Sequence, residues 1–151
     1  MRLCLALVAL AQLPIASVPS HAAAQTAAPT AASPASQDYV YPSGSGLLFF
    51  YVRPERVSDF EAVVTRLSQV IEASADDTRR RQGGSWQAFR SREQVGGAAV
   101  FIFFFNPVVA GADYDPVKML AESVPADTPA LYDQLKAAVI RVERMSLTKL
   151  R

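Results

Sequence analysis

Cysteine and histidine are nearly missing from this sequence. Its 151 residues include one cysteine, Cys4, and one histidine, His21, and both lie within the first 21 positions. A single cysteine excludes a disulfide within the chain. Any chemical role for these two residues depends on whether the N-terminal segment is retained.

The N-terminal segment has the order of features found in a cleavable secretory signal peptide. Arg2 supplies one positive charge, residues 3–13 form an apolar run interrupted only by Gln12, and a small-residue stretch ends at Ala24. The run is shorter than the roughly 20 residues that cross a bilayer, so we expect no membrane span in the mature protein. We predict cleavage near Ala24, with Ala22 and Ala24 as the small-residue pair, and export to the periplasm or the cell exterior.

Cleavage near Ala24 would remove both Cys4 and His21. The mature protein would then lack thiol nucleophiles, Ser-His-Asp catalysis, His-ligated haem and His/Cys zinc sites. Two carboxylate pairs remain, Asp76 with Asp77 and Asp113 with Asp115, but neither comes with a further group that makes a hard-metal site specific. We therefore predict no metal and no cofactor.

Excess charge of either sign is also missing. The chain carries 15 Lys and Arg residues against 14 Asp and Glu, and removal of Arg2 with the signal peptide leaves 14 against 14. A near-neutral surface has no broad basic field to attract nucleic acid. We predict no nucleic-acid partner.

Composition divides the chain into three parts. Residues 1–24 are the predicted signal peptide. Residues 25–38 are rich in Ala, Pro, Ser and Thr and cannot bury enough apolar area to offset the entropy of ordering, so they are predicted to form a flexible tether. Residues 39–151 suit one domain with one hydrophobic core.

The first half of this domain predicts a strand, a helix and a hairpin. Residues 46–53 form a short apolar run between glycines and a proline, which is typical of a buried strand. Ser58 and Glu61 match a capping box, so a helix is expected to begin at Ser58. Residues 76–84 are polar and end in two glycines. Strands are predicted over 85–93 and 98–106, joined by a turn at Gly96-Gly97. The helix is expected to bury an apolar stripe: Phe60, Val63, Val64, Leu67, Val70 and Ile71.

The second half predicts two helices and a final strand. Asp115-Pro116 pairs an N-cap residue with a proline at the first helical position, and the helix should run through Ser123. Thr128-Pro129 repeats this signal, and residues 145–150 are predicted to form the last strand. The second of these helices is expected to carry an apolar stripe: Leu131, Leu135, Ala138, Val139 and Val142.

This order of elements predicts an α+β fold of the ferredoxin-like βαββαβ type, with helices on one face of an antiparallel sheet. A strand with one solvated face should alternate apolar and polar residues. Residues 47–52 and 100–105 are instead apolar at odd-numbered and even-numbered positions alike. We therefore expect both faces of the sheet to be covered, one by helices and the other by the sheet of a second copy in a homodimer.

The chain resembles the dimeric α+β barrel superfamily, and in particular its small exported bacterial members. The resemblance covers roughly residues 39–150. It rests on GLLFFYVRP at 46–54, RRRQGGSW at 79–86, VFIFFFNPV at 100–108 and ADYDP at 112–116. It implies a barrel formed by two sheets across a dimer, with any ligand cavity between sheet and helices or inside the barrel. The superfamily includes cofactor-free oxygenases, haem-degrading enzymes, isomerases, dye peroxidases and proteins without known activity, so the fold does not decide the function.

Four residues near the strand ends are candidates for binding a small ligand. Trp86 can form a cavity wall, or pack as an ordinary strand tryptophan. Asn106 can face a cavity or complete the turn before a proline. Tyr114 lies on a loop from which it can reach a cavity mouth, and Tyr51 can line a site or pack in the core.

The run Arg79-Arg80-Arg81 offers a further binding site, since guanidinium groups hold carboxylates and phosphates through two parallel hydrogen bonds. Arg79 and Arg81 are the candidate ligand-binding residues. The alternative is local ion pairing with Asp76 and Asp77 just upstream, which stabilises little.

These observations favour a non-catalytic protein that binds a small apolar ligand or serves as a structural or interaction module. The alternative is a cofactor-free oxygenase or isomerase working with Tyr, Trp, Asn, Arg and carboxylates. A closed cavity beside Trp86 and Asn106 with an unpaired polar group would favour ligand binding, and a filled core there would favour the structural role. Partner capture through the tether or the arginine cluster is a third possibility.

Overall fold

The computed structural model describes residues 39–42 and 44–151, and these residues belong to one compact unit. The predicted signal peptide and tether lie outside the described residues.

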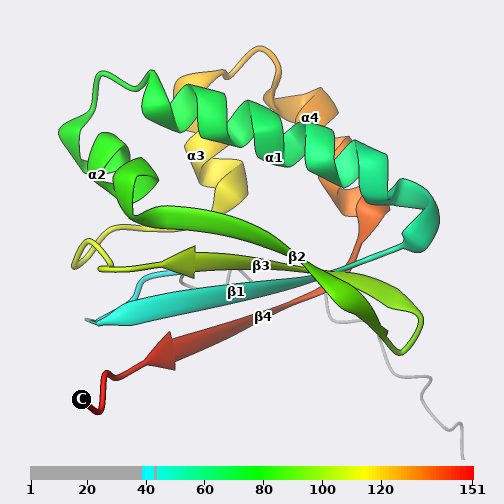
Figure 1. Ribbon diagram of the computed structural model, residues 1–151. Coiled ribbons are helices and arrows are strands. Elements are labelled where there is room, and N and C mark those ends of the chain that lie inside the picture. Colours follow the sequence, from blue (N-terminus) through cyan, green and yellow to red (C-terminus); the bar gives the residue numbers. More distant parts are fainter. Residues whose placement is uncertain (1–38, 43) are drawn as a thin grey trace, which may run out of the picture. The chain divides into compact units, whose positions relative to one another are not determined.

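A four-stranded antiparallel sheet organises the described domain. Its strands are β1 (Ser45–Val52), β2 (Trp86–Val95), β3 (Ala98–Phe105) and β4 (Val139–Leu147), and they lie side by side in the order β2-β3-β1-β4. The two central strands are the two apolar runs of the sequence. The more polar strands β2 and β4 form the edges (Figure 1).

Helices cover one face of this sheet (Figure 1). Pro54–Arg56 forms a short 3-10 turn, followed by α1 (Val57–Glu72) and α2 (Asp77–Ser85) before β2, and by α3 (Pro116–Ser123) and α4 (Thr128–Ala138) between β3 and β4. The element order and the central position of the first and third strands define a ferredoxin-like α+β fold. The predicted fold class is confirmed.

The core lies between the sheet and α1, α3 and α4. Alternate residues of β1 from Leu48 to Val52 point at the helices and are buried, because successive side chains of a strand face opposite sides. Phe60 of α1 lies against the ring of Phe101 at a centroid distance of 4.7 Å. The largest fully buried side chains are Tyr41, Tyr114, Phe50, Phe60, Leu48, Leu120, Gln82, Val52 and Val63.

Two predicted turn and cap signals have the expected geometry. Gly96 and Gly97 join β2 to β3 with φ angles of 58° and 79°, the left-handed conformations that a two-residue hairpin turn requires. Asp115 caps α3, and its side chain accepts a hydrogen bond of 2.8 Å from the backbone N–H of Val117.

The predicted capping box at Ser58 is wrong. Helix α1 begins at Val57, directly after the 3-10 turn that starts at Pro54, so Ser58 already lies inside the first turn. Arg56, the residue just before α1, makes no side-chain cap hydrogen bond but forms an ion pair with Asp59. The chain is thus turned into the helix by the proline-led 3-10 turn. The predicted apolar stripe is buried as expected, with Val64 half-buried at its edge.

The polar stretch at 76–84 is helical, although its sequence did not predict a helix. Asp76 caps α2 by accepting a hydrogen bond from the backbone N–H of Arg79 at 2.8 Å. Gly83 allows α2 to approach α1 closely, since a Cβ at that position would come within 2.6 Å of Cγ2 of Ile71. Gly83 therefore serves helix packing rather than a loop.

The boundary between α4 and β4 also differs from the prediction. Helix α4 ends at Ala138, and β4 starts at Val139, six residues before the expected strand at 145–150. Val139 and Val142, which the predicted helical stripe included, lie on β4 and pack against the core from there. The spacing of three between Val139 and Val142 fits an apolar helix stripe, and it also fits a strand that starts with a bulge. Both valines pair with β1, so this segment is a strand.

Candidate functional site

The side of the sheet turned away from the helices carries a broad apolar surface, which we call the open face. The residue pairs between neighbouring strands show which side chains belong to this face. Phe49 lies opposite Ile102 of β3 and Glu143 of β4, and Ile102 lies opposite Phe89 of β2. Side chains directly opposite each other share one face. The apolar residues of the open face are Leu47, Phe49, Tyr51, Phe89, Val100, Ile102, Phe104 and Met145.

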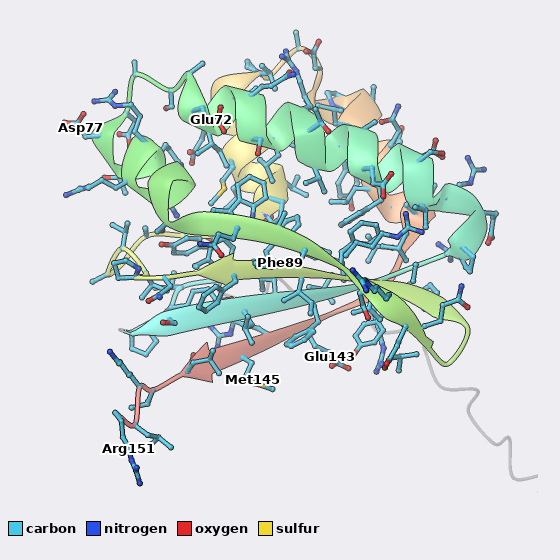
Figure 2. All side chains as sticks on the ribbon, viewed as in Figure 1. Glu72, Asp77, Phe89, Glu143, Met145 and Arg151 are labelled. Atoms are coloured by element: carbon cyan, nitrogen blue, oxygen red, sulfur yellow. The ribbon has the colours of Figure 1, made fainter. Side chains whose placement is uncertain are left out.

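Several of these apolar side chains are accessible to solvent. Phe89 is 50% exposed and Met145 is 51% exposed, and Leu47, Phe49 and Ile102 are half-buried. Figure 2 labels Phe89 and Met145 on the two edge strands that bound this face. Contiguous exposed apolar area of this kind marks interaction surfaces in soluble proteins.

A polar cluster occupies one end of the open face. The guanidinium of Arg141 lies 3.6 Å from the ring centroid of Tyr51 and forms a 2.6 Å ion pair with Glu143, and the hydroxyl of Tyr51 donates a 2.9 Å hydrogen bond to Glu143. That hydrogen bond raises the pKa of Tyr51 above its usual value. The predicted site residue Tyr51 is therefore engaged by neighbours on the sheet surface and lies outside the helix-covered core.

Trp86 lies on the helix side of β2, where it borders a very small cavity. Its ring packs edge-on against Phe103 at a centroid distance of 4.8 Å. The cavity leaves about 10 Å³ for the centre of a water molecule, near the minimum that holds one water. Nε1 of Trp86 is buried and has no hydrogen-bond partner among the described residues, so one water fits the chemistry of the site. The cavity is lined by Leu67, Ile71, Gln82, Trp86, Phe103, Phe105, Tyr114, Pro116 and Met119.

Tyr114 also lines this cavity, whereas Asn106 does not. The hydroxyl of Tyr114 accepts a 2.7 Å hydrogen bond from the backbone N–H of Val109, and its ring packs on Phe105 at 4.3 Å. Asn106 is exposed and accepts a 2.9 Å hydrogen bond from the hydroxyl of Ser45 across the start of β1. Asn106 thus contacts the start of β1 and lies outside the cavity beside Trp86.

The three consecutive arginines have separate surroundings. The side chain of Arg79 is 13% exposed and reaches Glu122 on α3. Arg80 pairs with Asp77 within α2, and Arg81 makes a long 3.4 Å contact with the hydroxyl of Thr78. Of the predicted ligand-binding arginines, Arg79 lines a large cleft, while Arg81 lies on the exposed surface of α2.

One buried polar residue, Gln82, is not indicated by the sequence pattern. Gln82 is 1% exposed; its Nε2 donates to the carbonyl of Asp113 at 3.0 Å, and its Oε1 accepts from Arg79 at 2.8 Å. Recognition of α2 as a helix would have revealed it, since residues 79 and 82 then lie one turn apart on one face.

Two features that bear on alternative functions are absent from the described residues. Among residues 39–42 and 44–151, no group of three or more His, Cys, Asp or Glu side chains is placed to hold a metal ion. No helix in that part of the chain has the length and apolarity to span a membrane.

Comparison with known proteins adds little beyond the fold. No family model and no curated protein matches the sequence. Among solved structures, the chain is similar to a dimeric ferredoxin-like protein from an uncultured marine organism, at 13% identity and a TM-score of 0.37, over 74% of this chain and 93% of that one. A similarity at this level carries no inference about assembly or ligand.

Proposed function

We propose that this protein is a non-catalytic interaction module that assembles through its open face, with a second copy of the chain as the partner. The observation that carries the proposal is the apolar surface on the side of the sheet away from the helices, centred on Phe49 and Ile102. The core of the domain is filled by the helix-facing side chains, and folding of one chain buries the apolar residues of this second face only in part.

The size of the open face suits a stable dimer. Four strands about 4.8 Å apart, each with at least eight residues at about 3.3 Å, give a plan area of at least about 500 Å². Side chains make the accessible area larger than the plan area, and specific interfaces bury roughly 600–1,000 Å² on each partner. Burial of apolar area favours association at about 25 cal/mol per Å², and this gain has to exceed the about 4–15 kcal/mol of freedom that two partners lose on binding.

Two features favour a second copy over another partner. A two-fold contact needs a surface that complements itself, and the open face places the positive Arg141 next to the negative Glu143, so either charge can meet its opposite on a rotated copy. The mature chain is expected to be near neutral, so two copies do not repel each other strongly.

Sedimentation velocity of the purified domain at micromolar concentration tests this proposal. The wild-type protein should sediment as a dimer, and Phe89→Glu or Met145→Glu should convert it to a monomer with unchanged circular dichroism. Both side chains are about half exposed, so a charge there leaves the protomer core intact.

Tyr132 provides the control, since it is 42% exposed but lies on α4, which covers the other side of the sheet. Tyr132→Glu should remain dimeric. A wild-type protein that sediments as a monomer at these concentrations would refute the proposed assembly, and equal effects of all three substitutions would refute the open face as its site.

The same assembly gives a place for a small apolar ligand, between the two sheets. The cavity beside Trp86 holds about one water, so it leaves no space for a larger molecule at that point between the sheet and the helices. For the same reason this cavity gives no support to the oxygenase or isomerase alternative. Native mass spectrometry of protein isolated from its own cells would report a retained ligand as added mass on the dimer.

We also propose that the protein works outside the cytoplasm. The support is the order of charged, apolar and small residues at 1–24. Mass measurement of the protein from a periplasmic or culture fraction should give an N-terminus near Gln25. An intact N-terminus in the cytoplasmic fraction would rule export out.

A further inference from the structure

A large cleft with two arginines in its lining opens on the helical side of the domain, where α1, α2 and α3 meet. It has a volume of about 650 Å³, within the range of small-molecule sites. Figure 2 labels Glu72 and Asp77 near it, at the end of α1 and the start of α2. The cleft is lined by Arg66, Gln69, Val70, Ala73, Ser74, Ala75, Asp76, Arg79, Glu122, Ser123 and Val124.

Arg79 is held rigidly in the wall of this cleft. Its Nη1 donates to Oε1 of the buried Gln82 at 2.8 Å and to the carbonyl oxygen of Asp113 at 2.6 Å. These two bonds fix the plane of the guanidinium and leave its other edge, formed by Nε and Nη2, to face Glu122. That edge is the fork with which arginine binds carboxylates and phosphates.

Glu122 fills the fork of Arg79 incompletely. A single oxygen, Oε2, accepts from both Nε at 2.8 Å and Nη2 at 2.5 Å, so the parallel pair of hydrogen bonds, one to each oxygen, is not formed. Glu122 is also 55% exposed, and ion pairs with an exposed member contribute little stability. An incoming anion with two free oxygens can therefore bind Arg79 better than Glu122 does.

A second guanidinium lines the same cleft from α1. Arg66 is paired at 2.9 Å with Asp127, whose side chain is 54% exposed. Both positive charges of the cleft are thus neutralised by exposed carboxylates of the chain itself. Asp76, another acidic residue of the lining, is occupied as the cap of α2.

We propose that this cleft binds a small molecule bearing a carboxylate or phosphate group, which takes the place of Glu122 on the fork of Arg79, with Arg66 as a second positive charge. Glu122 acts as an internal competitor for the site. The cleft and the open face belong to opposite sides of the sheet, so this proposal does not depend on dimer formation.

Titration of the purified domain with inorganic phosphate and with succinate, followed through the arginine Nε–H signals in NMR spectra, tests the proposal. Glu122→Gln removes the competing charge, so the affinity for at least one of the two anions should rise about tenfold, the change that 1.4 kcal/mol corresponds to. Arg79→Lys, which keeps the charge but loses the fork, should abolish this gain. Preference for phosphate or for succinate identifies the headgroup.

Glu61→Gln is the matched control, since Glu61 pairs with Arg90 and is similarly exposed, at 48%, but lies outside the cleft. It should bind both anions as the wild type does. If Glu122→Gln destabilises α2, Asp127→Asn frees Arg66 on the other wall and should tighten binding by a smaller factor. Equal affinities of Glu122→Gln, Asp127→Asn and Glu61→Gln would show that Arg79 only holds α2 to α3, and would overturn the proposal.

Discussion

Two adjacent glycines in α2 have opposite constraints at the scale of single residues. A Cβ at Gly83 would lie 2.6 Å from Cγ2 of Ile71, whereas a Cβ at Gly84 would have nothing within 4 Å. We predict that Gly83→Ala lowers the free energy of unfolding by about 1–3 kcal/mol through overpacking. Gly84→Ala should raise it by about 0.5–1 kcal/mol, because alanine loses less backbone entropy in a helix. Urea denaturation of both variants measures the difference, and equal effects would contradict the close packing of α2 on α1.

Tyr41 makes stability sensitive to alkaline pH. The ring is fully buried, and its hydroxyl donates a 2.9 Å hydrogen bond to the carbonyl oxygen of Leu47. Burial raises the pKa of Tyr41 above its usual value, an effect that the charge of Arg144 opposes only in part.

The unfolded chain ionises Tyr41 at the ordinary pKa of about 10, while the folded protein keeps its proton. The contribution of Tyr41 is therefore complete below about pH 10 and is lost as the pH rises further. Tyr41→Phe should lower stability by about 1 kcal/mol at neutral pH, through the lost hydrogen bond, and should show a weaker decline above pH 10. Denaturation at several pH values measures this decline. If the stability of both proteins fell equally above pH 10, the alkaline sensitivity would come from other residues.

At the scale of elements, the helix starts differ in how they are stabilised. Asp76 and Asp115 accept hydrogen bonds from the first free N–H groups of α2 and α3, whereas Ser58 lies within the first turn of α1 and makes no cap bond. We predict that Asp76→Ala and Asp115→Ala each lower the free energy of unfolding by about 1 kcal/mol. Ser58→Ala should change it by no more than about 0.5 kcal/mol. If Ser58→Ala lowered the free energy of unfolding as much as the two aspartate substitutions, Ser58 would act as a helix cap after all.

At the scale of the whole molecule, assembly through the open face would couple stability to concentration. A dimer that dissociates on unfolding gains about 1.4 kcal/mol of apparent stability for each tenfold rise in protein concentration. The thermal midpoint of the wild-type protein should rise accordingly, and that of Phe89→Glu should not. A wild-type midpoint independent of concentration would contradict the proposed dimer without bearing on the anion cleft.

Signals confined to a few neighbouring residues were sufficient for much of this fold. The apolar runs at 47–52 and 100–105 predicted the central strands, Gly96-Gly97 predicted the hairpin turn, and Asp115-Pro116 predicted the start of α3. Each depends on local geometry: side-chain alternation, a left-handed φ angle, or a free N–H group near a carboxylate. The expectation that both faces of the sheet are apolar follows from the same alternation.

Contacts between distant residues decided the rest. Helix α2 has weak helical propensity and two glycines, and it forms against α1 and α3 through the packing of Gly83 on Ile71 and the bond of Arg79 to Glu122, 43 residues away. Pairing with β1 places Val139 and Val142 on a strand although their spacing also fits a helix. The sequence alone thus determined the elements whose stability is local, and the tertiary structure decided those that exist only because a partner element lies beside them.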